Sequence, residues 1–414
     1  MFETFFKYPS VKARHKNAPY AQERAQFLAH CLQEGYSHAS LGAFAADLLW
    51  VARKLNINPG RKVSDDQITE AAKDWRERER CCGRALKHYQ ASDRFIQVAR
   101  KWLRFLGWLQ EPTHEPCPFL SLVEEFARWM EQERGLSPST IASRSWHVER
   151  FLRWYGVKKQ PIDKIEVSDV DSFLQNRGRS WARITTANCA VSLRAFFRFA
   201  GMHGWCRPAI AEAIHAPRIY SQENLPAGPS WKDVQGLLKS METEKPSDIR
   251  DCAIVMLFAV YGLRTSEVSK LRLEDIDWEN DRILIRRAKR MEPQIYPLAP
   301  TVGNAIAKYL RRVRPQCPHR EVFITLAAPF HAVSRSVLYT MVSRRITGLG
   351  ILLPHKGPHS LRHACATHLV SLGFSIKEIG DHLGHRSFSA TRIYAKVDMK
   401  GLREVAKFDL GDLP

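Results

Sequence analysis

The sequence predicts a mainly α-helical protein of several domains, ending in an α+β domain with a small antiparallel sheet. Apolar residues recur at three- and four-residue steps through most of the first 207 residues, as in amphipathic helices. Beyond residue 230, short segments of β-type residues stand between further helical patterns. The length of 414 residues also exceeds the usual size of one compact core, so we expect two or three domains.

The segment from 115 to about 205 is predicted to be a bundle of helices. A second helix begins at 136–140 (LSPST) and a third covers 186–201. Both carry basic side chains opposite an apolar face, which suits DNA binding, although a solvated charged face is the ordinary alternative. The apolar residues of the first helix are Phe119, Leu122, Val123, Phe126 and Met130. The residues expected to contact DNA are Arg144, Arg183, Arg194 and Arg198.

The first 113 residues look like a degenerate copy of this bundle. The matching segments are 35–40 with 135–140, 63–65 with 167–169, and 103–107 with 197–201. Three matches in the same order predict a duplicated helical unit.

Proline-rich stretches divide the chain. We expect an N-terminal helical domain over 1–113, a helical bundle over 114–207, a linker over 208–229 and an α+β domain over 230–414. Within the last domain, 248–261 is predicted to be a buried helix. Its predicted strands are 282–287, 294–298 and 321–326.

The chain is strongly basic, with 63 Lys and Arg against 43 Asp and Glu and a net charge of +20. Because the basic residues alternate with aromatic residues along predicted helices, a folded nucleic-acid-binding surface is expected, although such charge also occurs in proteins that are merely soluble. The nine cysteines form neither a disulfide framework nor a metal-ligand pattern. No apolar run reaches the ~20 residues of a membrane span, and the N-terminus lacks a signal-peptide pattern. We expect a cytoplasmic protein without a membrane segment.

One segment of the C-terminal domain, 261–268 (YGLRTSEV), places an arginine in a tight turn. Gly262 is expected to end one helix and Thr265 to cap the next, with Glu267 in the following first turn. Arg264 then projects from the turn. A guanidinium held in this way can bind a phosphate through two parallel hydrogen bonds.

A second segment, 357–363 (GPHSLRH), places His359 and Arg362 on one face of a first helical turn, with Pro358 at its start. Helix N-termini favour anions, so both side chains suit the same phosphate. A zinc site built from His359, His363 and His368 is the alternative, but the His-Glu-x-x-His arrangement is absent.

A third segment brings a histidine and a tyrosine together near the end of the chain. Ser375 and Glu378 form a capping-box pattern, and Gly384 is expected to end that helix. His385 follows directly. Ser389 can cap a short final helix that carries Tyr394, although a single tyrosine there is usually an ordinary buried residue.

Together, these segments resemble the tyrosine recombinase, or phage integrase, family. The matching text is 262–267 (GLRTSE), 359–363 (HSLRH), 383–385 (LGH) and Tyr394, in the family's order and with similar spacing. The resemblance covers the whole C-terminal domain, and 136–205 resembles the family's SAM-like, helical core-binding domain. The first 113 residues fall outside the usual two-domain plan.

The resemblance implies a role for each matched residue. Arg264, Arg362 and His359 would surround the scissile phosphate of DNA. Tyr394 would be the nucleophile. Lys289 fits the place of the family's catalytic lysine, eight residues before Pro297, although neighbouring arginines, Arg286 and Arg287 among them, crowd the same turn. The implied catalytic set is Arg264, Lys289, His359, Arg362, His385 and Tyr394, with Glu267 and His363 in support.

The chemistry agrees with these roles. Attack of a phenol on a phosphodiester builds up negative charge, which two arginines and imidazole donors stabilise without a metal or another cofactor. Tyrosine has an ordinary pKa near ~10, so a neighbouring group must help remove its proton. Lys289 would protonate the departing 5′-hydroxyl as a general acid.

The resemblance therefore implies a site-specific recombinase or integrase that clamps double-stranded DNA between its core-binding and catalytic domains. It would cut and rejoin strands through a 3′-phosphotyrosine, as a homotetramer on DNA or together with other recombinases, and it would be associated with the nucleoid when bound. The duplicated N-terminal segment favours an enzyme of a mobile element, with phage, transposon and chromosome-resolution roles all open. Two alternatives stay open. One is type IB topoisomerase-like nicking and resealing, and the other is a catalytically inactive DNA-binding accessory protein.

Overall fold

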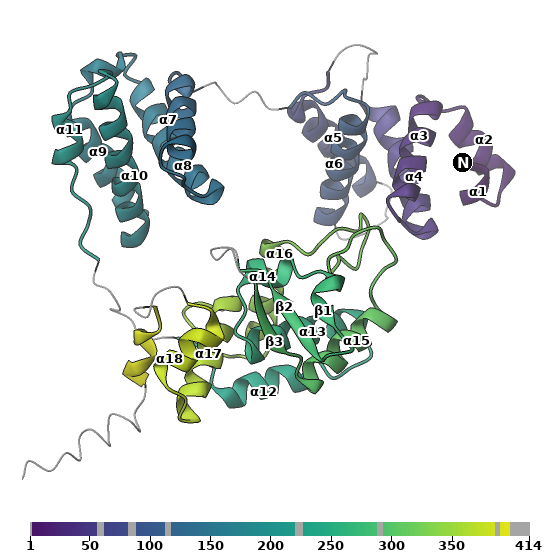
Figure 1. Cartoon of the computed structure of the whole chain (residues 1–414). Coiled ribbons are helices and arrows are strands. Elements are labelled where there is room, and N and C mark those ends of the chain that lie inside the picture. The colour runs from purple at the N-terminus through teal and green to yellow at the C-terminus, as the bar shows by residue number, and fades with distance from the viewer. Residues whose placement is uncertain are drawn as a thin grey trace, which may run out of the picture. The chain divides into compact units, whose positions relative to one another are not determined.

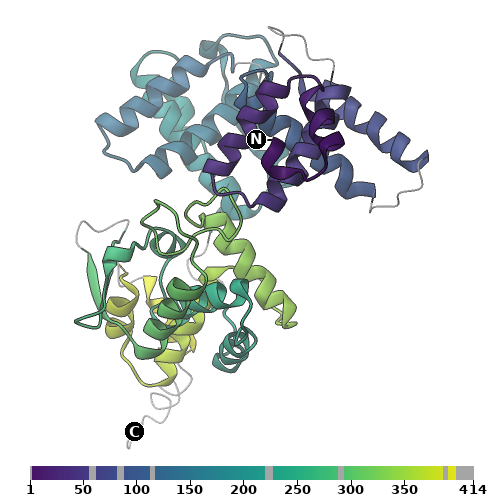
Figure 2. The ribbon, with the colours of Figure 1, turned by 90° about the vertical axis from the view of Figure 1, so that its right-hand side faces the viewer.

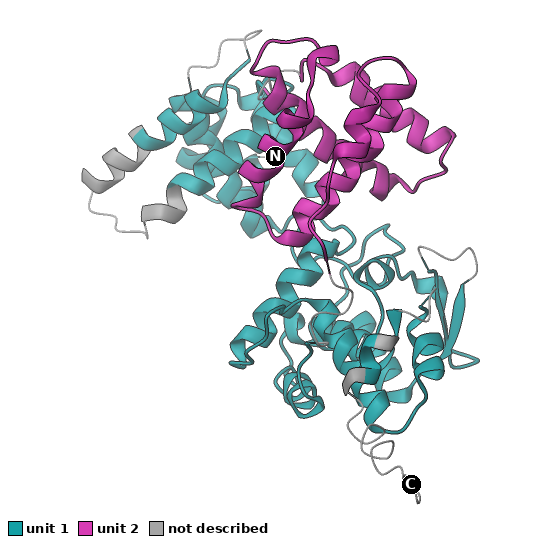
Figure 3. Ribbon diagram, turned by 90° about the vertical axis from the view of Figure 1, so that its left-hand side faces the viewer, with its two compact units in different colours: residues 1–110, 224–414 teal, residues 111–223 magenta. Residues whose placement is uncertain are grey.

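The computed structural model describes residues 2–55, 62–81, 88–111, 117–219, 227–287, 293–385 and 390–397. The chain divides into two compact units, Met1–Gln110 with Asn224–Pro414, and Glu111–Glu223 (Figure 3). Helices dominate both units and the only sheet among the described residues has three antiparallel strands, which confirms the predicted fold class. None of the described helices combines the length and apolarity that a bilayer crossing requires.

The unit Glu111–Glu223 is a helical bundle (Figure 1). Its described helices are α7 (Leu120–Gln132), α8 (Pro138–Gly156), α9 (Val167–Gly178), α10 (Arg183–Met202) and α11 (Ala209–Ala213), with a 3-10 turn η1 (Ile162–Lys164). Helix α8 begins where the Ser137 hydroxyl accepts the Thr140 N–H at 3.4 Å. The core is aromatic, with the Phe126 and Phe196 rings in edge contact at 5.5 Å. The three predicted helices are confirmed as α7, α8 and α10.

The N-terminal segment is also helical. Its described helices are α1 (Phe2–Phe5), α2 (Pro9–Lys16), α3 (Ala21–Gln33), α4 (His38–Lys54), α5 (Asp65–Cys81) and α6 (His88–Phe105). They share a core of buried residues drawn from Phe2 to Leu109.

Helices α3 to α6 and α7 to α10 share local features that support the predicted duplication. Ser37 caps α4 as Ser137 caps α8, and each cap follows a glycine of positive φ. Near the end of each copy, a tryptophan N–H donates to the carbonyl five residues earlier: Trp108 to Leu103 at 2.8 Å and Trp205 to Ala200 at 2.9 Å.

These features shift the register of two sequence matches. Gly107 and Gly204 each stand directly before the tryptophan whose backbone N–H makes this bond, and both have positive φ. Gly107 therefore corresponds to Gly204, whereas the sequence match aligned it with Gly201. Ser64 exchanges hydrogen bonds with Gln67 at the start of α5, as Glu166 does with Asp169 at the start of α9, so the sequence match at 63–65 is shifted by two residues. Helix caps set this alignment because they fix where each helix begins.

The C-terminal segment contains helices around one small sheet, of order β1-β2-β3 (Figures 1 and 2). The strands are β1 (Ile276–Asp277), β2 (Arg282–Ile285) and β3 (Gln294–Pro297), and β2 pairs with β3 so that Ile283 lies opposite Tyr296. Its described helices are α12 (Trp231–Lys239), α13 (Pro246–Val260), α14 (Thr265–Ser269), α15 (Pro300–Arg312), α16 (Arg335–Gly348), α17 (Pro358–Ser371) and α18 (Ile376–Leu383), with 3-10 turns η2 (Leu273–Asp275) and η4 (Arg392–Val397).

The predicted strands at 282–287 and 294–298 are confirmed as β2 and β3, each slightly shorter than predicted. The predicted strand at 321–326 is wrong, because only isolated bridges form at Glu321 and Ile324. This stretch is apolar because it is buried in the core. Side chains satisfy part of its backbone: the Tyr309 hydroxyl accepts the Ile324 N–H at 3.0 Å, and the Arg314 guanidinium donates to the carbonyls of Glu321 and Val322.

Candidate active site

Helix α18 ends where several predicted site residues gather. The Ser375 hydroxyl accepts the Glu378 N–H at 3.2 Å, and the Glu378 carboxylate accepts the Ser375 N–H at 2.8 Å, which confirms the predicted capping box. Gly384 ends the helix with a φ of 64°, also as predicted, and the chain turns there into His385. The last carbonyl groups of a helix lack intrahelical partners, so they can accept hydrogen bonds from side chains.

Arg264 reaches this helix end from the turn between α13 and α14, where Gly262 has a φ of 58°. Its Nη2 donates to the Gly384 carbonyl at 3.1 Å, and its Nη1 donates to Glu267 Oε1 at 2.9 Å. The backbone N–H of Arg264 donates to Glu267 Oε2 at 2.7 Å. The prediction that Thr265 caps α14 is wrong. Thr265 is the first helical residue, and the Glu267 carboxylate satisfies the backbone at the helix start.

Arg362 reaches the same helix end from α17. Its side chain is almost fully buried, and its Nη2 donates to the Leu383 carbonyl at 2.9 Å while its Nη1 donates to the Gly262 carbonyl at 2.5 Å. Burial, and then the charge of Arg264, lower the pKa of Arg362 to about 10. The two arginines are therefore held on adjacent carbonyl groups, those of Leu383 and Gly384.

Helix α17 also carries His359 and His363, whose ring centroids lie 4.4 Å apart. His359 lines a cleft of about 530 Å³ together with Arg264 and Tyr339. Desolvation, and then the charges of Arg362 and Arg264, lower the pKa of His359. Burial, and then the neighbouring His359, lower the pKa of His363 to about 4. Both rings therefore favour the neutral form at pH 7.

Tyr394 lies on η4 and is 2% exposed. Its hydroxyl lies 2.9 Å from Nδ1 of His363. Burial raises the pKa of Tyr394 to about 12, against the opposing charge of Arg362. Ser389, the predicted cap of this helix, lies outside the described residues.

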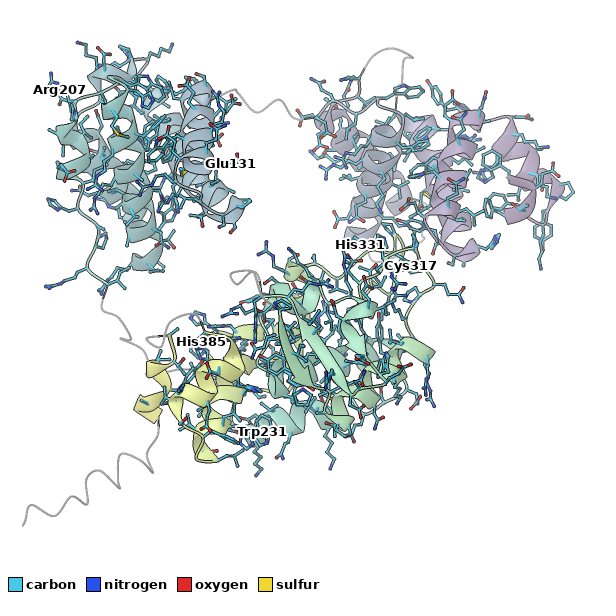
Figure 4. All side chains as sticks on the ribbon, in the orientation of Figure 1. Glu131, Arg207, Trp231, Cys317, His331 and His385 are labelled. Atoms are coloured by element: carbon cyan, nitrogen blue, oxygen red, sulfur yellow. The ribbon has the colours of Figure 1, made fainter. Side chains whose placement is uncertain are left out.

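His385 directly follows α18 and its cap Gly384 (Figure 4). Its Nδ1 lies 2.7 Å from the Thr391 hydroxyl. Burial, and then the charges of Arg362 and Arg264, lower the pKa of His385 to about 4. The hydroxyl contact fixes the ring, so the opposite nitrogen is oriented as well.

The structure thus gathers five of the six predicted catalytic residues, because Arg264, His359, His385 and Tyr394 lie within electrostatic reach of the fifth, Arg362. Lys289 lies outside the described residues. Two guanidinium groups and neutral imidazoles form a donor set for an oxyanion, with a phenol beside them. Among the described residues, no group of His, Cys, Asp or Glu could hold a metal ion.

Sequence reasoning treated Arg287 only as a neighbour that obscures Lys289, but the structure buries it in this site. Arg287 is 4% exposed, and its Nη1 donates to Glu267 Oε2 at 2.7 Å. The alternation of side chains between the two faces of β2 could have revealed this placement. Ile283 and Ile285 are buried, so the second residue beyond them points to the same face.

The predicted DNA contacts of the helical bundle lie in different settings. Arg183 is exposed and Arg144 is half-buried. Arg194 donates from Nη2 to the Ile214 carbonyl at 2.6 Å, and Arg198 lies 3.3 Å from the Glu212 carboxylate. These last two side chains therefore contribute to the packing of α10 against the segment that follows it.

A second cationic group in the bundle was not predicted. Arg150 lies 5.0 Å from the Trp146 ring and 5.7 Å from the Trp181 ring. Trp146 is 46% exposed, and Arg177 also contacts Trp181. A partly exposed tryptophan with stacked arginines can contact both bases and phosphates.

Two family models match the chain. The model of the phage integrase family matches residues 230–400, and that of the phage integrase N-terminal SAM-like domain matches residues 123–204. Among curated proteins, integrase/recombinase y4rA of Sinorhizobium fredii is 35% identical over 72% of this chain and 72% of its own length. Integrase/recombinase y4rF of the same organism is 29% identical over 98% of this chain and 95% of its own length.

Other relatives are named tyrosine recombinases. XerD of Listeria monocytogenes is 30% identical over 69% of this chain and 97% of its own length. Among solved structures, XerH bound to a palindromic difH substrate has a TM-score of 0.53 at 18% identity, over 86% of this chain and 99% of that chain. At such identity the likeness concerns the fold. Together with the family models, these relatives show that the chain belongs to the phage integrase family of tyrosine recombinases.

Proposed function

We propose that this protein is a site-specific DNA recombinase that cleaves and rejoins strands through a phosphotyrosine at Tyr394. The observation that carries the proposal is the placement of two arginines on neighbouring carbonyl groups at the end of α18, with His359 and His385 around them and Tyr394 beside them. Every member of this group suits one task, the stabilisation of a phosphorane-like oxyanion next to a phenol.

In this mechanism Arg264 and Arg362 bind the scissile phosphate. Each uses only part of its five N–H donors on protein carbonyl and carboxylate groups, so donors remain for phosphate oxygens. His359 and His385, neutral at pH 7, donate further hydrogen bonds to the developing charge. Glu267 positions Arg264 by accepting both its backbone N–H and its guanidinium.

The covalent step conserves the phosphodiester energy. The Tyr394 hydroxyl gives up its proton to a neighbouring base as its oxygen bonds to phosphorus, the phosphorus–O5′ bond breaks, and the leaving oxygen takes a proton from a general acid. Lys289 is assigned this role from the resemblance, since it lies outside the described residues. In the reverse step, a 5′-hydroxyl attacks the phosphotyrosine and frees the phenol, so neither ATP nor another cofactor is needed.

DNA would be held by residues 114–207 and 230–414, the proposed core-binding and catalytic domains. The net charge of +20 supports a partner of opposite charge. The bundle offers Arg144 and Arg183, and the Trp146 and Arg150 pair adds a stacking surface that the sequence did not reveal. The proposed linker, 208–229, would connect the two parts of this clamp, and the proposed N-terminal domain, 1–113, would lie outside it.

The assembly and setting are also proposals. A tetramer on two DNA sites, alone or with a second recombinase, suits an exchange that cuts four strands in pairs. The protein would act on DNA in the cytoplasm as the recombinase of a mobile element.

A supercoiled plasmid that carries two copies of the bound site tests the function. Recombined circles, together with a covalent adduct between DNA and Tyr394, support the proposal. Relaxation alone would indicate topoisomerase-like resealing, and retarded DNA without any strand break would indicate an accessory protein. The Tyr394→Phe variant is the control, because it retains every other group of the site.

A further inference from the structure

The end of α18 carries more than two side-chain donors. The final four carbonyl groups of the helix and its cap accept hydrogen bonds in sequence from different elements. Gln294 Nε2 donates to Asp381 at 2.9 Å, Arg287 and Tyr296 to His382, Arg362 to Leu383 and Arg264 to Gly384. These carbonyls form the negative end of the helix dipole, so a cluster of guanidinium groups is favoured there.

Arg287 is almost fully buried in this cluster. Its guanidinium donates to Gln294 Oε1 from Nε at 3.2 Å and from Nη2 at 2.9 Å, and it also donates to the Tyr296 hydroxyl. Its side chain and that of Glu267 are both 1% exposed. A cation this deep in the protein requires compensation, which the Glu267 carboxylate and the helix end provide.

The Glu267 carboxylate connects Arg287 to Arg264. Oε2 accepts the Arg287 Nη1–H and the Arg264 backbone N–H, both at 2.7 Å, and Oε1 accepts the Arg264 side chain. Displacement of Arg287 would leave Glu267 buried with one cation fewer. The carboxylate would then reorient, and Arg264 would lose its fixed position.

Arg287 also fixes the end of β2. It stands two residues before Lys289 in the sequence, and through Gln294 and Tyr296 it connects the end of β2 to β3 and to α18. Gly384 packs directly against it, because a Cβ at Gly384 would collide with the Arg287 guanidinium. One side chain therefore joins the turn of Arg264, the hairpin and the helix end before His385.

We propose that Arg287 is a positioning residue for strand cleavage, which holds Arg264 and the β2–β3 hairpin in register without contacting DNA. This inference rests on the proposed function. It requires an arginine, because its planar fork of donors contacts Glu267, Gln294, Tyr296 and the His382 carbonyl at once, which a lysine ammonium cannot do.

The test compares Arg287→Met and Arg287→Lys with a control, Arg286→Gln. Arg286 is the adjacent residue, but its side chain is 53% exposed and forms an ion pair with Asp275 at 2.7 Å instead. Single-turnover cleavage is measured on a nicked duplex that carries the site at which the wild-type chain forms its covalent adduct, and binding is measured on the same duplex. We expect Arg287→Met to slow cleavage about 100-fold and Arg287→Lys about 10-fold, with affinity within about three-fold of wild type, since a misplaced oxyanion donor costs such factors. Arg286→Gln should cleave within about two-fold of wild type.

A methylphosphonate at the scissile position separates positioning from damage to the fold. This group is uncharged, so the cleavage rate depends less on the placement of Arg264. The loss of cleavage rate in the Arg287 variants, relative to wild type, should therefore be smaller on this substrate. A deficit of equal size on both substrates would overturn the proposal, as would Arg287 variants that cleave as fast as wild type. If Arg287→Met fails to fold, Arg287→Lys, which retains the buried charge, decides the same comparison. A wild-type chain that forms no adduct would overturn the proposed function as well, whereas a wild-type adduct with normal cleavage by Arg287 variants overturns this assignment alone.

Discussion

The Tyr394 hydroxyl lies 2.9 Å from Nδ1 of His363, so the phenol proposed as nucleophile contacts a half-buried imidazole in the protein without DNA. Burial raises the pKa of this phenol to about 12. A phenolate is therefore strongly disfavoured in this conformation. To become an attacking group, this buried phenol must gain access to the phosphate and lose its proton.

Tyr394→Phe should abolish the covalent adduct with DNA while changing DNA affinity less than about three-fold. The change removes one buried hydroxyl and one hydrogen bond, so the free energy of unfolding should fall by about 1 kcal/mol. Denaturing gels of the cleavage reaction and urea unfolding provide the two measurements. Tyr155→Phe is the matched control, because Tyr155 is also buried and donates one hydrogen bond, to the Pro161 carbonyl, but lies in the other unit. Adducts that persist in the Tyr394 variant would assign the nucleophile to another residue.

Stability should fall as the pH drops below about 6.5. Burial lowers the pKa of both His363 and His385 to about 4, below the value of 6.5 that a histidine has in the unfolded chain. The unfolded state thus binds more protons between these values, so the free energy of unfolding is fully present above pH 6.5 and declines toward pH 4, by at most about 3 kcal/mol per histidine. Urea titrations at several pH values measure this decline. His363→Gln should flatten it, and an unchanged pH profile in that variant would contradict the assignment to His363.

Gly262→Ala should destabilise the protein by about 1–3 kcal/mol, because φ is 58° there and an added Cβ would collide with Leu383. The change also disturbs the carbonyl that accepts Arg362, so cleavage should fall further than stability alone explains. Gly236→Ala is the control, since Gly236 lies within α12 and its Cβ would meet no atom within 4 Å. That variant should be as stable as wild type or slightly more so. Equal stability and equal cleavage rates of the two variants would show that the turn at Gly262 tolerates a side chain.

The sequence predicted those parts of the site that depend on local rules. The capping box of Ser375, the turn at Gly262 and the end of α18 at Gly384 follow from residues a few positions apart. The cap of α14 was predicted wrongly because the helix begins one residue earlier than expected, where Glu267, three residues after Arg264, accepts the Arg264 N–H. Local rules also placed β2 and β3.

Contacts between distant elements could not be predicted in this way. The acceptors of Arg264 and Arg362 lie on α18, 120 and 21 residues away in the sequence. The apolar stretch at 321–326 was predicted to be a strand because a β-type pattern does not distinguish ladder pairing from burial against side-chain hydrogen-bond partners. In both cases the missing information is which element packs against which.

DNA binding should weaken steeply with salt, because each phosphate neutralised by Lys or Arg releases counterions. With at least about six contacts, affinity should fall about 1,000-fold between 50 and 200 mM salt.

Arg144→Gln should lower the slope of log affinity against log salt by about one, as expected for one lost phosphate contact. Arg198→Gln is the control. Arg198 already lies 3.3 Å from the Glu212 carboxylate and must give up this partner to bind a phosphate, so its loss should change the slope less. Fluorescence anisotropy across a salt series measures both slopes. A flat response in the wild type would exclude a basic clamp, and a larger effect of Arg198 than of Arg144 would move the DNA-contacting face of the bundle toward the end of α10.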